Sequence, residues 1–331
     1  MQLFRTRIGR TVLVGLVLAL GAGILVAVLA RKDRAPCHLT ATLTPSCGEL
    51  WGAALDSRNS ALAATVVATE LATGRRLDIV HTYHRWDDVF PTATESQLAG
   101  DGRLMFMNWE PVTAKGKNLT WGTIAQGGAD SVIRAEAHRL AAFDHPVLIS
   151  FSHEPELDYR NHGSVSDYAA AFRHVVTLSK QSGATNVRWV WDLMGLSDPV
   201  WRARYPTMWP GADYVDWIGW DPYNAAACKN RPWQSFSQTV TPFYQWLQGQ
   251  SFARGKPFML AEYGTVEGAT ATDKAAWFSS VPGALADLPR LKALVYFDYP
   301  APPGNCDWLV TSSTESAQAF GRLARDAGFR S

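Results

Sequence analysis

Short apolar runs alternate with longer amphipathic stretches along most of the chain. Eight of these runs are nearly continuous in apolar residues, as expected of parallel strands that are buried on both faces. We predict strands at residues 50–56, 77–83, 103–109, 146–152, 187–192, 215–220, 257–261 and 293–297. Helical patterns lie between them, for example at 131–143, 165–182 and 272–286. Eight strand-and-helix units predict an α/β fold, a closed (β/α)₈ TIM barrel.

The first 30 residues differ from the rest. Residues 11–30 carry no charge, and Arg5, Arg7 and Arg10 precede them. Twenty helical residues span about 30 Å, the thickness of a bilayer core, so residues 11–30 are predicted to anchor the chain in a membrane if they remain uncleaved. A cleaved signal peptide stays open as the alternative, because residues 28–30 offer a small-residue cleavage site. We therefore divide the chain into this segment (1–30), a linker with a disulfide (31–48) and the barrel (49–331).

Four cysteines follow the apolar segment: Cys37, Cys47, Cys228 and Cys306. No C-x-x-C spacing occurs, which argues against a zinc ribbon or a thioredoxin-like site. Cys37 and Cys47 close a short loop ahead of the barrel, whereas Cys228 and Cys306 each follow an aromatic-rich strand. We predict the pairs Cys37–Cys47 and Cys228–Cys306, and hence an extracytoplasmic protein that is membrane-anchored or secreted.

Composition narrows the class of function. The chain of 331 residues has 31 Lys and Arg against 30 Asp and Glu, and this near-neutral balance argues against nucleic-acid binding. It also has 14 Trp, 10 Tyr and 14 Phe, and 14 tryptophans are more than packing usually requires. Flat aromatic faces are what proteins present to sugar rings, so the composition indicates a carbohydrate ligand.

Two predicted strands end in a carboxylate. Glu154 follows the fourth strand and Glu262 the seventh. In a (β/α)₈ barrel the chemistry lies at the carboxyl ends of the strands, so the two side chains are expected at the same mouth. Cleavage of a glycosidic bond needs two such groups, one to protonate the leaving oxygen and one to attack the anomeric carbon.

Other catalytic classes fit the sequence poorly. His153-Glu154-Pro155-Glu156-Leu157 is not a zinc-protease H-E-x-x-H motif, because the fifth residue is Leu and the Pro opposes a continuous helix. No G-x-S-x-G nucleophile elbow is present. We expect no metal and no cofactor, since carboxylate chemistry needs none.

Several segments of the chain, taken together, resemble one protein family. His153-Glu154 resembles the acid/base motif of glycoside hydrolase family 26, in which a His precedes the catalytic Glu. Residues 213–224 look like the family's sixth-strand signature and 261–264 like its nucleophile strand, while 50–53 and 295–298 are similar to its first and eighth strands. The resemblance runs from about residue 49 to 325 in the right order. Most members are endo-β-1,4-mannanases, and some act on β-1,3-xylan or mixed-linkage β-glucan.

The resemblance implies a role for each matching residue. Glu154 is the expected general acid/base, Glu262 the nucleophile, Tyr223 the phenol that hydrogen-bonds the nucleophile, and His153 a neighbour of substrate and acid. The expected reaction is a retaining double displacement by an endo-acting enzyme. Its expected substrate is a β-linked polysaccharide, and β-1,4-mannan is the first candidate. Retention predicts carboxyl groups about 5–5.5 Å apart.

One departure concerns the substrate. Family mannanases commonly place a Trp in the loop after the acid/base, whereas Tyr159 is the nearest aromatic residue here. Glu156 is a rival carboxylate two residues from Glu154. Further aromatic residues expected to contact sugar, at strand ends or in the loops beyond, are Trp86, Trp109, Trp220 and Trp308.

Several alternatives stay open. The substrate could be β-glucan or β-1,3-xylan instead of mannan. A non-catalytic glycan-binding barrel and a cell-envelope interaction platform are two further functions. The sequence does not reveal the oligomeric state.

Overall fold

The computed structural model describes residues 37–56, 61–270, 272–300 and 306–330. Residues Leu39–Ser331 form one compact unit. The predicted anchor or signal segment at 1–30 and the first part of the linker, 31–36, lie outside the described residues. Within the described residues, no helix has both the length and the apolar character needed to cross a membrane.

The predicted barrel is confirmed. Eight parallel strands close into a ring in the order β1-β2-β3-β4-β5-β6-β8-β9, and the pairings β6–β8 and β1–β9 complete it. The strands are β1 Leu50–Leu55, β2 Ile79–Arg85, β3 Leu104–Glu110, β4 Val147–Phe151, β5 Val187–Leu193, β6 Trp217–Trp220, β8 Phe258–Thr265 and β9 Leu291–Asp298. A two-residue strand, β7 (Tyr223–Asn224), pairs with the far end of β8.

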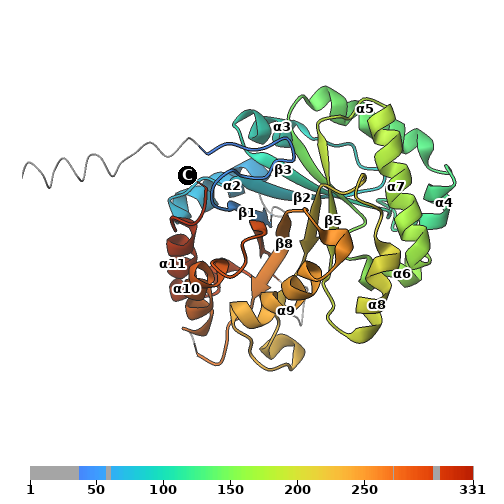
Figure 1. The fold of residues 1–331 in the computed structure, drawn as a ribbon. Helices are drawn as coiled ribbons and strands as arrows, with labels where there is room; N and C mark the ends of the chain where they lie inside the picture. The colour runs from blue at the N-terminus through green and yellow to red at the C-terminus, as the bar shows by residue number, and fades with distance from the viewer. Residues whose placement is uncertain (1–36, 57–60, 271, 301–305, 331) are drawn as a thin grey trace, which may run out of the picture. The chain divides into compact units, whose positions relative to one another are not determined.

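Helices surround this ring, as Figure 1 shows. Those of eight or more residues are α2 Leu62–Thr73, α3 Ala93–Gly100, α5 Asp130–Phe143, α6 Pro155–His162, α7 Val165–Gln181, α8 Pro199–Met208, α9 Phe236–Gln248, α10 Asp273–Leu285 and α11 Thr314–Ala324. The shorter ones are α4 Trp121–Ala125 and the 3₁₀ turns η1 Ala227–Lys229, η2 Ser251–Ala253 and η3 Val310–Ser312. Side-chain caps begin several of them; in α7, for example, Ser164 and Asp167 form a capping box.

The lower interior of the barrel is filled by apolar side chains, such as Leu104 and Phe106 of β3 and Val190 of β5. Leu43, in the short hairpin that precedes β1, closes the base of this core. A second, larger cluster packs the helices against the outside of the strands. Because the lower interior is filled, a cleft that enters the barrel can open only at the opposite end, where the strands terminate.

The predicted disulfide Cys228–Cys306 is confirmed, and it joins the segment after β7 to the segment after β9. Cys37 and Cys47 are both in the disulfide form as well, the state that their predicted pairing requires. No free cysteine is present among the residues described.

Candidate active site

A cleft of about 430 Å³ lies at the carboxyl ends of the strands. Eight residues line it: Tyr83, His153, Glu154, Tyr223, Glu262, Phe297, Tyr299 and Trp308. They come from segments at or after β2, β4, β7, β8 and β9, so the cleft is assembled from residues that are far apart in the sequence. Five of them are aromatic, in keeping with a sugar ligand.

A β-bulge in β8 turns Glu262 toward this cleft. Leu260 pairs with Leu294 and Tyr263 with Tyr296, so three steps on β8 match two on β9. Such an extra residue bends the strand and re-aims a side chain. Ala261 packs in the barrel interior, and the next residue, Glu262, also faces inward. The Glu262 amide donates to Asp221 Oδ1 at 2.7 Å, which fixes the bulge.

Glu154 is held by a strained backbone. Its φ is +46° and that of Ser152 is +52°, both in the left-handed region that non-glycine residues rarely adopt. Pro155 starts α6 directly behind Glu154, which is the N-cap residue of that helix. Strain of this kind is concentrated at functional sites, where the surroundings enforce it.

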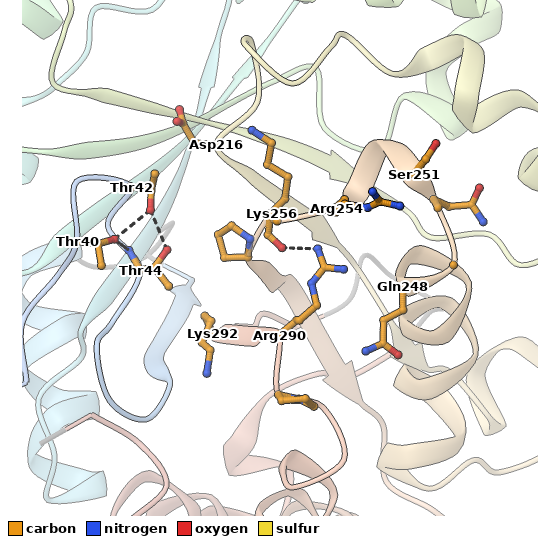
Figure 2. A pocket seen from close by; sticks show the side chains of 15 residues that line it. Thr40, Thr42, Thr44, Asp216, Gln248, Ser251, Arg254, Lys256, Arg290 and Lys292 are labelled. Carbon is orange, nitrogen blue, oxygen red and sulfur yellow. Dashed lines mark hydrogen bonds between the residues drawn. The ribbon is translucent and has the colours of Figure 1, made fainter.

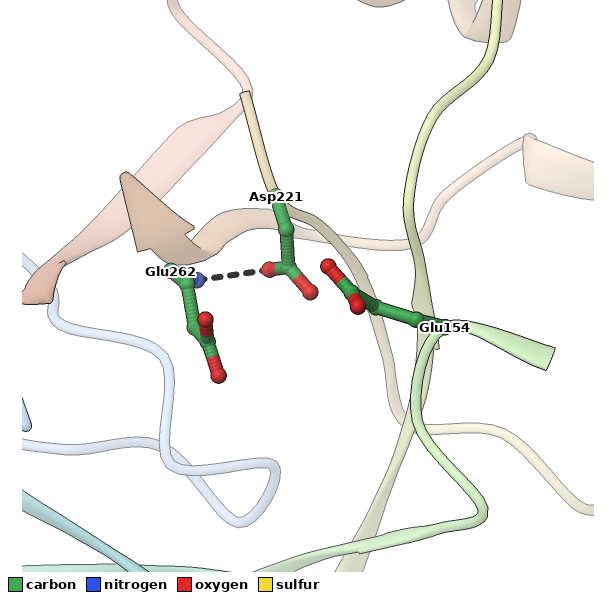
Figure 3. Close-up of side chains that lie close together, drawn as sticks. All are labelled: Glu154, Asp221 and Glu262. Carbon is green, nitrogen blue, oxygen red and sulfur yellow. Dashed lines mark hydrogen bonds between the residues drawn. The ribbon is translucent and has the colours of Figure 1, made fainter. Parts of the chain in front are cut away.

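Glu154, Asp221 and Glu262 form one carboxylate cluster, with Asp221 between the other two (Figure 3). One oxygen of each lies within 4.8 Å of the corresponding oxygen of the other two. Retaining glycosidases have carboxyl groups about 5–5.5 Å apart and inverting ones about 6.5–9.5 Å. An oxygen of Glu154 and one of Glu262 lie within 4.8 Å of each other, which is compatible with the retaining arrangement.

Two phenols hold the Glu262 carboxylate. Tyr83 Oη donates to Oε1 at 2.6 Å, and Tyr223 Oη donates to Oε2. Burial, followed by the nearby Glu262 charge, raises the pKa of both tyrosines well above the usual value, so both remain proton donors. Glu262 is 5% exposed, and these donors compensate its charge and fix its orientation.

The Glu154 carboxyl is adapted to carry a proton. Burial raises its pKa to about 8, the neighbouring Glu262 and Glu156 add to the effect, and His153 opposes it. A carboxyl with that pKa is largely protonated at neutral pH. The two carboxyls therefore differ in their environments: two phenols donate hydrogen bonds to Glu262, whereas Glu154 holds a proton at neutral pH.

His153 pairs with Glu110 at the end of β3. Its Nδ1 contacts Glu110 Oε1, and its backbone amide donates to the same oxygen at 3.3 Å. Burial alone would lower the pKa of His153, but Glu110, Glu154 and Glu262 outweigh it and hold the pKa well above the usual value. His153 is therefore a cation beside the acid, and its charge limits how far the pKa of Glu154 rises.

Two further buried carboxyls lie near this cluster. Burial, together with the charge of Asp192, Glu262 and Glu154, raises the pKa of Asp221 well above its usual value. Asp192 of β5 is fully buried, and neither oxygen has a hydrogen-bond partner among the described residues. Burial raises its pKa as well.

Glu154, Asp221 and Glu262 are also the group in the described part of the chain whose spacing could hold a metal ion. The chemistry of the donor set fits a cation poorly. Two of the three carboxyls have a raised pKa, and Tyr83 and Tyr223 occupy the oxygens of the third. A hard divalent cation prefers ionised oxygen ligands that are free to bind it.

Sequence comparison finds relatives among glycoside hydrolases. No family model matches the chain. The chain is 29% identical over 269 residues to endoglucanase H of Acetivibrio thermocellus, covering 77% of this chain and 28% of that protein. It is 30% identical over 115 residues to a β-1,3-xylanase of a Vibrio species, covering 31% of this chain and 25% of that protein. The chain thus spans less than a third of the length of these curated relatives.

Solved structures supply the comparison of folds. The catalytic domain of a Bacillus sp. JAMB-750 GH26 endo-β-1,4-mannanase superimposes with a TM-score of 0.60 at 17% identity, covering 84% of this chain and 86% of that one. The barrel has the glycoside hydrolase family 26 fold. A Cellulomonas fimi endo-β-1,4-mannanase double mutant gives a TM-score of 0.61 at 16% identity, covering 85% of this chain and 71% of that one. The predicted family resemblance is confirmed by these neighbours.

The barrel brings together five of the predicted site residues: His153, Glu154, Tyr223, Glu262 and Trp308 all line the cleft. The Trp308 ring lies 4.6 Å from that of Tyr223, centroid to centroid. Their roles toward a sugar stay predictions.

Three predicted sugar contacts need correction. Trp86 and Trp109 are 3% and 1% exposed, and their rings stack on each other at 4.5 Å. Trp220 is 1% exposed and packs against Phe243, Tyr244 and Phe258. These residues lie at strand ends, as predicted, but their side chains point outward into the layer between strands and helices. They are core residues of this barrel.

Glu156, the rival candidate for the acid, is buried and held by hydrogen bonds away from the cleft lining. It is 3% exposed and accepts hydrogen bonds from Tyr205 Oη at 2.7 Å and from the Met194 and Gly195 amides at 3.1 and 3.2 Å. Tyr159 does not line the cleft; it packs on Trp201 with ring centroids 5.4 Å apart.

Sequence reasoning assigned no role to several members of the site. Tyr83 is the last residue of a predicted strand, and this position at the carboxyl end of the strand could have indicated a site residue. Asp221 lies within the predicted sixth-strand signature. Glu110, Phe297 and Tyr299 also stand at or just after strand ends. Which of these turn inward depends on the register of the strands.

Proposed function

We propose that the chain is a retaining, endo-acting hydrolase of β-linked polysaccharide, with Glu262 as nucleophile and Glu154 as general acid/base. One observation carries the proposal. Two carboxyl groups from β8 and from the end of β4 share one aromatic cleft, with oxygens within 4.8 Å, and differ in their environments. Two phenols stabilise one as an anion, and burial keeps a proton on the other.

In the first step, a Glu262 oxygen attacks the anomeric carbon while Glu154 transfers its proton to the departing glycosidic oxygen. The carbon–oxygen bond to the leaving sugar breaks as the glycosyl ester with Glu262 forms. Tyr83 and Tyr223 orient the attacking carboxylate, and His153 stabilises the negative charge that Glu154 acquires.

The second step follows from the same electrostatics. Once Glu262 is esterified it has no charge, so one cause of the raised pKa of Glu154 disappears. The pKa of Glu154 falls, and the ionised carboxylate can remove a proton from water, which attacks the anomeric carbon and releases Glu262. Loss of a neighbouring charge thereby converts the acid into the base.

The substrate is proposed as a class, β-linked polysaccharide, with three candidate members. β-1,4-Mannan is supported by the fold neighbours, which are named endo-β-1,4-mannanases. β-Glucan is supported by the relative named endoglucanase H. The loop after Glu154 weakens the case for mannan, because family mannanases commonly have a Trp there and Tyr159 is the nearest aromatic residue here. β-1,3-Xylan follows from the shorter match to a β-1,3-xylanase.

The test is release of reducing ends by the full chain from galactomannan, glucomannan, mixed-linkage β-glucan and β-1,3-xylan. Glu154→Ala and Glu262→Ala should each abolish the activity. The product anomer, followed by NMR, should match the configuration of the bond cleaved, and a range of internal products should precede the shortest ones. Release of the opposite anomer would reject the double displacement.

Two other functions make different predictions. A glycan-binding barrel without turnover would bind one of these polysaccharides and release no reducing ends. An interaction platform would neither bind nor cleave them. Activity that Glu262→Ala removes would exclude both.

We further propose that the barrel works outside the cytoplasm, anchored through residues 11–30 or released after cleavage. The Cys228–Cys306 disulfide supports this location, because disulfides persist in oxidising compartments. Protease added to intact cells should digest an anchored barrel. Protection from protease, together with reduced cysteines, would contradict the proposal.

A further inference from the structure

A second concavity lies at the opposite end of the barrel from the cleft. It has a volume of about 790 Å³ and is lined by the N-terminal hairpin and by residues that precede β6, β8 and β9 (Figure 2). Asp216 lies just before β6, Lys256 and Pro257 just before β8, and Arg290 just before β9. Because these are the amino ends of parallel strands, this basal groove is at the base of the barrel and separate from the carboxylate cluster.

The lining of the basal groove is cationic. Arg254, Lys256, Arg290 and Lys292 contribute four positive charges, and Asp216 is the one acidic residue of the lining. Within the described residues, none of the four cations has a carboxylate oxygen within 4.0 Å. The Asp216 carboxylate accepts the Trp189 amide at 2.8 Å. The lining of the groove therefore carries a net positive charge in a protein whose overall charge is +1, although the carboxyl of Glu49, outside the lining, interacts electrostatically with Lys292.

Two of these cations are held in place by neutral groups. Lys256 Nζ donates to the carbonyls of Ala212 and Val215 at 2.7 and 2.6 Å. Arg290 Nη2 donates to the Lys256 carbonyl at 2.6 Å, and its guanidinium lies 3.9 Å from the centroid of the Phe258 ring. Burial lowers the pKa of Arg290, as expected for a cation without a carboxylate partner. Carbonyls orient these charges but do not cancel them, so an incoming anion meets preorganised cations.

The remaining wall is rich in hydroxyl and amide groups. Thr40, Thr42 and Thr44 lie in a row on the hairpin, with successive hydroxyl oxygens 3.0 Å apart. Trp217 Nε1 donates to the Thr42 carbonyl at 2.7 Å and fixes this row against the barrel. Gln248 stands across from it (Figure 2), and Gln250 also lines the groove. Among the described residues that line the groove none is aromatic, so it lacks the stacking surface of the upper cleft.

We propose that the basal groove is a second binding site, for an acidic oligosaccharide. Its carboxylates pair with the four cations, and its hydroxyl groups exchange hydrogen bonds with the threonines and glutamines. A neutral glycan would leave the cations unpaired, and a simple anion would make no use of the hydroxyl row. The site does not depend on hydrolysis in the upper cleft, and it would hold an acidic glycan away from the reacting carboxyls.

The test is calorimetric titration of the full chain with a pentamer of galacturonate. A polyoxyethylene detergent keeps residues 11–30 in solution and has no sugar head group. The fully methyl-esterified pentamer has the same hydroxyl groups without charge, and linear pentaphosphate has charge without sugar. We expect the acid pentamer to bind and the two comparison ligands to bind at least about tenfold more weakly.

Arg254→Gln with Lys292→Gln should weaken binding of the acid pentamer by about tenfold or more. Arg254 is exposed and Lys292 partly exposed, so thermal unfolding should be unchanged. The matched control is Lys115→Gln with Lys117→Gln, which removes two exposed cations elsewhere. Absence of binding, equal binding of pentaphosphate, or equal weakening in the control pair would each overturn the proposal. Failure to find hydrolysis in the upper cleft would contradict the proposed hydrolase function but not the proposed binding of an acidic oligosaccharide in the basal groove.

Discussion

The Glu154 carboxyl determines the pH range in which the proposed reaction can run. Its pKa is raised to about 8, and the first step needs the protonated form, so kcat/KM should fall as pH rises through about 8. Glu154→Gln should remove this alkaline limb and lower kcat/KM by about 10²–10⁴-fold on unactivated polysaccharide. A pH profile of both enzymes checks the prediction. Glu156→Gln is the neighbouring control and should keep the limb.

The phenols on Glu262 give a second prediction. Tyr83→Phe and Tyr223→Phe each remove one donor from the carboxylate without changing the ring. Each should lower kcat about 10–100-fold, because a hydrogen bond to a charged group contributes about 1.5–3 kcal/mol. Steady-state kinetics on the best substrate would measure this, with Tyr214→Phe as a control outside the cleft. Rates within a factor of two of wild type would show that the phenols do not orient the nucleophile.

For single residues, the sequence was most informative about which residue types stand at strand ends and least informative about the direction in which their side chains point. Glu154 and Glu262 could be proposed because each ends an apolar run. The inward turn of Glu262 depends on a bulge, and a bulge is set by pairing with β9, which no local pattern encodes. Trp109 illustrates the opposite error, since its position at the end of β3 is right but its side chain faces the helices.

The stacked pair Trp86 and Trp109 belongs to the packing between strands and helices. Trp109→Ala should lower the free energy of unfolding by about 3–5 kcal/mol, as for other large buried aromatic residues. Trp308→Ala should change stability little and raise KM, because Trp308 lines the cleft. Denaturant unfolding and kinetics on both variants separate the two cases. A raised KM with unchanged stability for Trp109→Ala would restore its predicted sugar contact.

The start of α3 is stabilised by a buried carboxylate. Glu95 accepts from His84 Nε2 at 2.8 Å, Thr82 Oγ1 at 2.6 Å and the Thr92 amide at 2.6 Å. Burial opposes ionisation of Glu95, but these partners outweigh it and lower its pKa to about 2. A lowered folded-state pKa stabilises the protein above the ordinary value of 4.5, and that stability is lost as pH falls through about 2.

Glu95→Gln should therefore lower the free energy of unfolding by about 3 kcal/mol at neutral pH, and by progressively less below the ordinary pKa. Urea unfolding at several pH values would show this trend. Glu315→Gln, also in the first turn of a helix, is the control. A difference between wild type and Glu95→Gln that does not change with pH would contradict the electrostatic account.

Elements were predictable where the pattern was long and bounded. The predicted helices at 131–143 and 165–182 differ from α5 and α7 by a single residue at one end. Strand ends were less accurate: β8 runs to Thr265, four residues beyond the predicted end, because its last residues pair with β7 and β9. A two-residue strand such as β7 has no pattern of its own and exists only through that pairing.

The Cys228–Cys306 disulfide ties together residues 78 positions apart. Its removal by Cys228→Ser with Cys306→Ser should lower the free energy of unfolding by about 2–4 kcal/mol. Trp308 lies two residues beyond Cys306, so KM should rise as well. Thermal unfolding and kinetics with and without a reductant would check both effects. A reductant that changes neither quantity would show that the bond does not brace the cleft.

The closed architecture was the most predictable property of the whole molecule. Eight apolar runs separated by helices leave few other folds, and closure between β6 and β8 follows from strand number and twist. The basal groove could not be predicted in this way. Arg254, Lys256, Arg290 and Lys292 come from two chain segments that look like ordinary solvated loops, and only closure gathers them on one surface.

Glu262 is held at one oxygen by a side chain 179 residues earlier and at the other by one 39 residues earlier. A cut in the loop between α7 and β5 would separate Tyr83 and Glu154 from Glu262, so neither fragment should cleave a glycan. Recombined fragments should regain turnover only when the ring closes between β4 and β5. Sugar release would then work as a split reporter, in which a chemical signal appears only when two halves of a barrel have found each other.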